Sequence, residues 1–187
     1  MGLRLMRSAG ERPRVIGHRG ARGHAPENTM PSFQKALELG ADWIELDVHI
    51  TKDSHLVVIH DDSVDRTTGG SGLIASLTWD EIRHLDAGSW YDPAFAGAHI
   101  PSLEEVLEWA KGRVPLIMEI KYAREEKGDI VDRLVEAIKR HQMVDQVEVI
   151  SFDHRMVRQV KELEPAIPTG ILYVLSLIHI SEPTRLG

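Results

Sequence analysis

Residues 44–60 have the sequence IELDVHITKDSHLVVIH, which predicts a strand, a tight turn and a returning strand. Side chains alternate between the two faces of a strand, so Glu45 and Asp47 share one face and the apolar residues around them point to the other. The same alternation is typical of half-solvated edge strands that carry no chemistry. The acidic pair therefore becomes a candidate site only in combination with the rest of the chain.

The returning run, residues 56–59, is apolar and largely β-branched, and it ends on His60. If Asp53 and Ser54 form a two-residue hairpin loop, Asp47 falls directly opposite His60. This hairpin is therefore expected to bring two carboxylates and an imidazole close together.

Composition limits the class of protein. The chain has 187 residues, 42% of them hydrophobic, which is enough for one domain with a sizeable core. A net charge of −7 argues against nucleic acid as a partner, although a metal and a few basic residues can still bind a phosphate locally. No cysteine is present, which excludes disulfides and thiolate metal sites in this chain. No apolar run approaches the roughly 20 residues of a transmembrane helix, and residues 1–14 lack the apolar core of a secretory signal, so we expect a cytoplasmic protein without membrane insertion.

The chain before the hairpin predicts a strand, a loop and a helix. A strand at residues 14–17 runs directly into the tripeptide His-Arg-Gly at residues 18–20, which predicts a loop at the carboxyl end of the strand. A helix is expected over residues 30–39, with Asn28 or Thr29 as its N-cap. The strand that follows is then expected to lie parallel to the first.

After His60 the pattern loosens. Residues 61–100 contain no strong strand and are expected to form an excursion from the main fold. Thr78, with Glu81 three residues later, predicts a capped short helix inside it, and Ser102 with Glu105 predicts the start of the next helix.

Strands and helices then alternate again. Strands are predicted over residues 114–121, 147–152 and 169–174, and helices over residues 129–141 and 153–163. This alternation predicts an α/β fold with a parallel sheet. Because polar residues gather where strands end, the best fit is a (β/α)8 TIM-type barrel with its site on the carboxyl face, of which the chain holds about the first five strands.

Residues 175–187 do not continue this pattern. Their sequence, LSLIHISEPTRLG, fits neither a clean strand nor an amphipathic helix, and it resembles the in-frame translation of a transposon-type sequencing adapter. We therefore expect a partial barrel over residues 1–174, with residues 61–100 as an insertion, followed by a non-native tail. A barrel cut after five strands leaves apolar edges uncovered, so we expect the chain to be aggregation-prone and weakly active or inactive.

Three carboxylates are expected where strands end: Glu45, Asp47 and Glu119. Hard oxygen ligands of this kind suit Ca²⁺ or Mg²⁺, and without a metal the three groups would raise one another's pKa. Zinc is a rival metal, but the chain has no H-x-x-x-H spacing. The remaining histidines are expected on the surface or in loops, with His49 as a reserve candidate: His24, His49, His55, His84, His99, His141 and His154.

Two histidines and two cations complete the candidate site. His18 and His60 come from neighbouring strand units, and imidazole can both accept and donate protons near neutral pH. Arg19 and Lys121 supply positive charge suited to phosphate oxygens. A metal, two histidines and two cations together are typical of phosphodiester cleavage.

Seven short runs, in order, resemble the glycerophosphodiester phosphodiesterase family. They are GHRG at 17–20, PENT at 26–29, ELDV at 45–48, KD at 52–53, HD at 60–61, DRTTG at 65–69 and MEIK at 118–121. The resemblance covers residues 15–174 and implies a barrel with a small insertion after the hairpin. The reaction implied is metal-dependent hydrolysis of a small glycerophosphodiester, such as glycerophosphocholine, to glycerol 3-phosphate and an alcohol.

The resemblance also implies roles for individual residues. His18 and His60 would be the acid/base pair, and Glu45, Asp47 and Glu119 would hold a divalent cation, Ca²⁺ or Mg²⁺. Arg19 and Lys121 would contact phosphate, and Glu27 and Asn28 would shape the loop beside the site.

Three other functions remain open on the sequence. A phospholipase C or lysophospholipase D of the same barrel type would use similar residues, although no membrane-binding helix is evident. A truncated chain could also be a catalytically inactive fragment. A phosphate-binding regulatory module would bind glycerol 3-phosphate and leave diesters intact.

Overall fold

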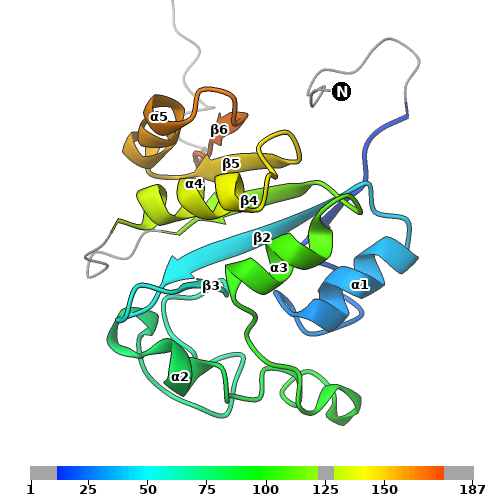
Figure 1. Ribbon diagram of the computed structural model, residues 1–187. Helices are drawn as coiled ribbons and strands as arrows, with labels where there is room; N and C mark the ends of the chain where they lie inside the picture. Colours follow the sequence, from blue (N-terminus) through cyan, green and yellow to red (C-terminus); the bar gives the residue numbers. More distant parts are fainter. Residues whose placement is uncertain (1–11, 122–128, 175–187) are drawn as a thin grey trace, which may run out of the picture.

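The computed structural model describes residues 12–121 and 129–174. Within them, five parallel strands form a sheet in the order β1-β2-β4-β5-β6, and β3 pairs antiparallel with β2 (Figure 1). The strands are β1 (Ile16–His18), β2 (Trp43–Ile50), β3 (Leu56–Val58), β4 (Leu116–Ile120), β5 (Val147–Ser151) and β6 (Thr169–Ile171). The helices that alternate with them are α1 (Met30–Glu38), α3 (Leu103–Ala110), α4 (Ile130–Arg140) and α5 (His154–Leu163). This arrangement confirms the predicted fold class, an incomplete (β/α) barrel.

Strand β2 pairs with three other strands of the described sheet. It pairs with β1 and β3 along one edge and with β4 along the other, and all eight of its residues are buried. Ile44 and Leu46 belong to the main hydrophobic core together with Phe33 of α1 and Leu107 of α3. Because successive strand residues point to opposite faces, the acidic residues of β2 lie on the face away from these helices, which in a barrel is the interior.

Helix α1 begins after Thr29, one of the two N-caps predicted, but the Thr29 hydroxyl donates to the carbonyl of Pro26 (2.6 Å) and does not cap the helix. Pro31 lies in the first turn, where its missing N–H costs no helical hydrogen bond. The chain leaves the helix through Gly40, whose φ of 83° is readily available only to glycine.

The predicted register of the hairpin is wrong by one residue. Asp47 does not lie opposite His60, because the strands pair so that Ile59 N donates to Asp47 O (3.1 Å). The turn holds three residues, 52–54, and not the two expected, since Ser54 adopts a left-handed conformation with φ 66°. A residue in this conformation commonly completes a three-residue hairpin loop.

The excursion over residues 61–100 contains no strand and has a hydrophobic cluster of its own. It includes the short helical segments η1 (Ile74–Ser76), α2 (Trp79–Ile82) and η2 (Pro93–Phe95). Its cluster also takes in residues of the hairpin and comprises Val57, Ile59, Val64, Ile74, Ile82, Ala87 and Ile100. The excursion therefore packs against β3 and the residue that connects it to His60.

Both predicted capping boxes are present. The Thr78 hydroxyl accepts from Glu81 N at the start of α2, and the Glu81 carboxylate accepts from Thr78 N. Ser102 and Glu105 make the same reciprocal pair at the start of α3. Helix α3 thus begins where the sequence predicts.

The outer strands expose apolar residues, as expected for an incomplete barrel. In the described part of the chain, β1 pairs only with β2, and β6 only with β5. Ile16 on β1 and Ile171 on β6 are 48% and 54% exposed. The interpretation of residues 175–187 as a non-native tail lies outside the described residues. Among the described helices, none has the length and apolar character needed to cross a bilayer.

Candidate active site

Three carboxylates converge toward the carboxyl end of the parallel pairing between β2 and β4. Asp47 and Glu119 are register partners across the two strands, and Glu45 lies two residues before Asp47 on the same face. One carboxylate oxygen from each residue lies within 4.8 Å of the others, and all three side chains are buried. The strand pairing alone therefore assembles the predicted cluster.

Neighbouring cations compensate the negative charge of this cluster only in part. Burial, with the neighbouring charges of Asp47 and Glu119, raises the pKa of Glu45 to about 7. The backbone hydrogen bond from Arg19 N (2.9 Å) lowers this pKa but is outweighed. Asp47 is 1% exposed, and its Oδ1 has no partner in hydrogen-bond geometry, although Lys121 Nζ lies 2.9 Å away. A buried carboxylate oxygen without a hydrogen-bond partner can serve as a ligand of a divalent cation, so this oxygen fits a metal site.

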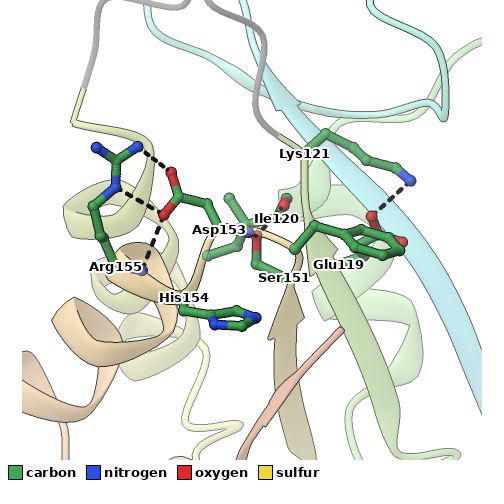
Figure 2. Close-up of a pocket in the computed structure, with 8 residues that line it drawn as sticks. Glu119, Ile120, Lys121, Ser151, Asp153, His154 and Arg155 are labelled. Carbon is green, nitrogen blue, oxygen red and sulfur yellow. Dashed lines mark hydrogen bonds and ion pairs between the residues drawn. The ribbon is translucent and has the colours of Figure 1, made fainter. Parts of the chain in front are cut away.

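Lys121 and Asn28 adjoin the carboxylates. The Lys121 ammonium donates to Glu119 Oε1 (2.7 Å), a pair visible in Figure 2. Asn28 reaches Asp47 from the loop after β1 and donates from Nδ2 to Oδ2 (2.8 Å). Asn28 has φ 55°, a left-handed conformation that asparagine tolerates better than most residues. The left-handed backbone at Asn28 therefore directs its side-chain amide toward the acidic cluster.

Arg19, in the loop after β1, lies between Glu27 of the same loop and Asp47 of the acidic cluster. Its guanidinium donates from Nη1 to Glu27 Oε1 (3.0 Å), and its Nε lies 3.4 Å from Asp47 Oδ2. The Nε is buried without a partner in hydrogen-bond geometry. Glu27 and Asn28 both lie in this loop, Glu27 against Arg19 and Asn28 against Asp47.

His18 lies at the edge of the cluster. Its Nε2 is 3.7 Å from Glu45 Oε2, and half of its side chain is exposed. Burial, together with the charges of Arg19 and Arg22, holds the pKa of His18 below its ordinary value. The imidazole is accordingly accessible to a ligand bound at the carboxylates.

His60 lies two residues after the end of β3 and contacts its neighbour Asp61, which was not predicted as a site residue. Its Nδ1 lies 2.6 Å from Asp61 Oδ1. Hydrogen bonds from Arg66 and then from His60 lower the pKa of Asp61 to about 2. Asp61 is therefore ionised at neutral pH and can only accept, so His60 Nδ1 carries the proton and Nε2 stays available.

Two residues of this group were missed as functional candidates, Asp61 and Arg66. Asp61 could have been found, because an acidic residue directly after a candidate catalytic histidine can orient it. Arg66 gives no such local signal, since its contact with Glu27 spans 39 residues of sequence.

The expectation that His49 lies on the surface or in a loop is wrong. His49 is on β2, where both faces of the strand are covered, and it is 2% exposed. Its Nε2 lies 3.2 Å from the carbonyl of His60. His49 therefore packs beneath the second candidate catalytic histidine and has no access to a ligand.

An open pocket of about 590 Å³ extends from the cluster toward β5. Figure 2 shows Glu119 and Lys121 at one side of it and His154 at the start of α5 on the other. Phe152 also lines it and is 54% exposed. Neither residue was predicted as part of the site, although Phe152 directly follows β5, as Lys121 follows β4.

A buried acidic cluster flanked by cations and histidines, at the carboxyl ends of parallel strands, defines the class of barrel proteins whose site lies on that face. The chain belongs to the glycerophosphoryl diester phosphodiesterase family, whose family model matches residues 18–177. The resemblance noted in the sequence is thereby confirmed.

Relatives with this name are similar over most of the chain. A glycerophosphodiester phosphodiesterase of Caldanaerobacter subterraneus is 46% identical over 88% of this chain and 68% of its own length. A putative glycerophosphodiester phosphodiesterase of Bacillus subtilis is also 46% identical, over 84% of this chain and 65% of its own. The chain thus spans about two thirds of the length of these curated relatives.

Solved structures show the same fold. A phosphodiesterase of Oleispira antarctica, solved in complex with the product sn-glycerol-3-phosphate, superposes with a TM-score of 0.80 at 36% identity. The match covers 85% of this chain and 65% of that one. A glycerophosphodiester phosphodiesterase of Agrobacterium tumefaciens gives a TM-score of 0.77 at 36% identity, over 83% of this chain and 65% of that one.

Proposed function

We propose that this chain carries the active site of a metal-dependent glycerophosphodiester phosphodiesterase, which hydrolyses its substrate to glycerol 3-phosphate and an alcohol. The observation that carries the proposal is the convergence of Glu45, Asp47 and Glu119 within 4.8 Å, with a buried oxygen on Asp47 that has no partner in hydrogen-bond geometry. The names of the relatives and the product bound in the Oleispira antarctica structure support the substrate class.

The three carboxylates would hold the cation, Ca²⁺ or Mg²⁺. When bound, it would supply positive charge beside the phosphate oxygens as negative charge develops on them. The residues fit this role because they are hard oxygen ligands and buried, and because one oxygen has no hydrogen-bond partner.

Arg19 and Lys121 would bind the phosphate. Arg19 comes from the loop after β1 and Lys121 from the end of β4, so they approach the carboxylates from the two parallel strands on either side of β2. Each is already held by an acidic partner, Glu27 or Glu119, and so is positioned before substrate arrives.

His18 and His60 would manage the protons. As the oxygen of a water molecule bonds to phosphorus, one imidazole accepts a proton from it. As the bond from phosphorus to the alcohol oxygen breaks, the other imidazole donates a proton to that oxygen. His60 has one defined free nitrogen for this step, because its Nδ1 is bound to Asp61.

Release of glycerol 3-phosphate from glycerophosphocholine tests the proposal. The assay compares this chain with the same chain joined to the C-terminal third of a relative, each with Ca²⁺ or Mg²⁺ and then with a chelator. We expect turnover that is strongest in the joined chain, lost with chelator, and lost in His18→Ala. Turnover that survives the chelator would contradict the metal-dependent mechanism.

The same assay separates the alternatives. Hydrolysis of lysophospholipids or phosphatidylinositol in place of glycerophosphocholine would favour the lipid-directed phosphodiesterases. Binding of glycerol 3-phosphate without turnover in either chain would favour a phosphate-binding module, and neither binding nor turnover would favour an inactive fragment.

A further inference from the structure

Arg66 joins the two loops that carry the candidate catalytic residues. Its guanidinium donates to both oxygens of Asp61, from Nε to Oδ2 (2.6 Å) and from Nη2 to Oδ1 (3.1 Å). It also donates to both oxygens of Glu27, from Nη1 to Oε2 (3.2 Å) and from Nη2 to Oε1 (2.7 Å). One side chain therefore makes two bidentate pairs, a geometry that the planar guanidinium fork favours.

The first pair acts on His60. Asp61 uses Oδ1 to accept from His60 Nδ1, and Arg66 holds the same carboxylate through both oxygens. The orientation of the carboxylate is thus set by the arginine, and the carboxylate in turn sets the position of the imidazole proton.

The second pair acts on Arg19. Glu27 Oε1 accepts from both Arg66 Nη2 (2.7 Å) and Arg19 Nη1 (3.0 Å), so the carboxylate lies between the two guanidinium groups. Glu27 is mostly buried. Burial alone would raise its pKa, but hydrogen bonds from Arg66 and Arg19 outweigh that effect and lower the pKa.

The contacts form one continuous chain from His60 through Asp61, Arg66 and Glu27 to Arg19. We propose that Arg66 is a positioning residue that sets the tautomer of His60 through Asp61 and the placement of Arg19 through Glu27. It couples the residue that moves protons to one that binds the phosphate. The proposal rests on the proposed function for its effect on turnover, but its effect on His60 can be measured without turnover.

Lysine cannot replace this arginine. Arg66→Lys keeps the positive charge but has a single ammonium, which cannot donate to both oxygens of two carboxylates in one plane. If only charge mattered at this position, lysine would suffice. If the two bidentate pairs are required, Arg66→Lys should behave like the neutral variant Arg66→Met.

A matched control is available in the same excursion. Arg83 is also about half exposed and donates to an acidic partner, Asp80, but neither residue touches the site. Arg83→Met therefore reports the general cost of removing a paired surface arginine from this segment.

The test is ¹⁵N NMR of the histidine side chains in this chain, in the wild type and in the three variants, with circular dichroism to show that each one folds. In the wild type and Arg83→Met we expect His60 as a single tautomer with its proton on Nδ1. In Arg66→Met and Arg66→Lys we expect a mixture of tautomers. A folded Arg66→Met or Arg66→Lys with the wild-type His60 spectrum would overturn the proposal, whether or not the chain turns over glycerophosphodiesters.

Kinetics give a second, independent readout in the joined chain described above. We expect kcat to fall about 10- to 100-fold in Arg66→Met, a fraction of the roughly 10²–10⁴-fold that general acid–base catalysis supplies. We expect Arg66→Lys not to restore it. Adding Asp61→Asn to Arg66→Met should lower kcat little further, because both changes interrupt the same chain of contacts. Full rescue by lysine, or additive losses in the double variant, would contradict the proposed coupling.

Discussion

Asp47 on β2 and Glu119 on β4 lie directly opposite each other across a parallel strand pair, so the backbone itself brings two buried carboxylates together. Like charges in this position repel, and the sheet tolerates them only with compensating cations nearby. Lys121 Nζ, 2.9 Å from Asp47 Oδ1 and 2.7 Å from Glu119 Oε1, supplies part of that compensation. A bound divalent cation would compensate the remaining negative charge.

Asp47→Asn should abolish stabilisation by metal. If the three carboxylates bind Ca²⁺ or Mg²⁺ only in the folded state, a metal concentration 100 times Kd stabilises the wild type by about 2.7 kcal/mol. We expect thermal unfolding to show a rise in Tm with added metal in the wild type and little or none in the variant. Glu148→Gln, which removes a carboxylate on β5 outside the cluster, should keep the rise. A metal-induced shift of equal size in Asp47→Asn would exclude the proposed site.

Asn28 combines a left-handed backbone with a hydrogen bond to Asp47, and two substitutions separate these features. Asn28→Gly keeps the backbone and loses the amide, whereas Asn28→Ala loses the amide and also adds backbone strain. Both should weaken metal binding to a similar degree. Urea unfolding should show Asn28→Ala less stable than Asn28→Gly by about 1–2 kcal/mol. Equal stabilities would show that the loop relaxes out of this conformation.

Gly20 is required for the loop that presents Arg19. Its φ is 79°, and a Cβ at this position would lie 2.4 Å from Ser32 Oγ and 2.7 Å from Ser32 C. Gly20→Ala should lose about 1–2 kcal/mol from backbone strain alone, with the steric overlap in addition. That corresponds to a Tm lower by at least several degrees. Gly23→Ala is the control, because nothing lies within 4 Å of its Cβ position, and it should unfold like the wild type.

Asp61 makes the stability of the fold depend on pH in the acid range. Its pKa is lowered to about 2 in the folded protein from 3.8, so its hydrogen bonds contribute stability above pH 3.8 that is lost as the pH falls through about 2. Asp61→Asn should flatten this part of the dependence, measured by urea unfolding between pH 2 and 6. Asp80→Asn, at the exposed pair with Arg83, should leave the profile unchanged. If Asp61→Asn kept the wild-type dependence of unfolding free energy on pH, other groups would account for the loss of stability in acid.

The acidic cluster and the barrel architecture could be predicted from the sequence because they depend on strand periodicity. Glu45 and Asp47 share a face in any regular strand, and parallel pairing brings Glu119 to the same edge whatever the loops do. The helix starts at Ser102 and Thr78 were equally predictable, since a capping box is a local pattern.

The hairpin register and the contacts of Arg66 could not be predicted in the same way. The register depends on the left-handed conformation of Ser54, and serine, unlike glycine or asparagine, does not signal it. Arg66 acts on Glu27 across 39 residues, a contact that exists only after the excursion has packed against the hairpin. The burial of His49 likewise follows from the covering of β2 on both faces.

The products formed from glycerophosphocholine in ¹⁸O-labelled water test the central claim most directly. ³¹P NMR of the joined chain with saturating Ca²⁺ or Mg²⁺ should show the diester replaced by glycerol 3-phosphate that carries ¹⁸O on phosphorus. The Asp47→Asn and His60→Ala variants of the same chain should leave the diester intact. Phosphocholine as the product, or an unchanged diester in the metal-saturated wild type, would contradict the proposed function.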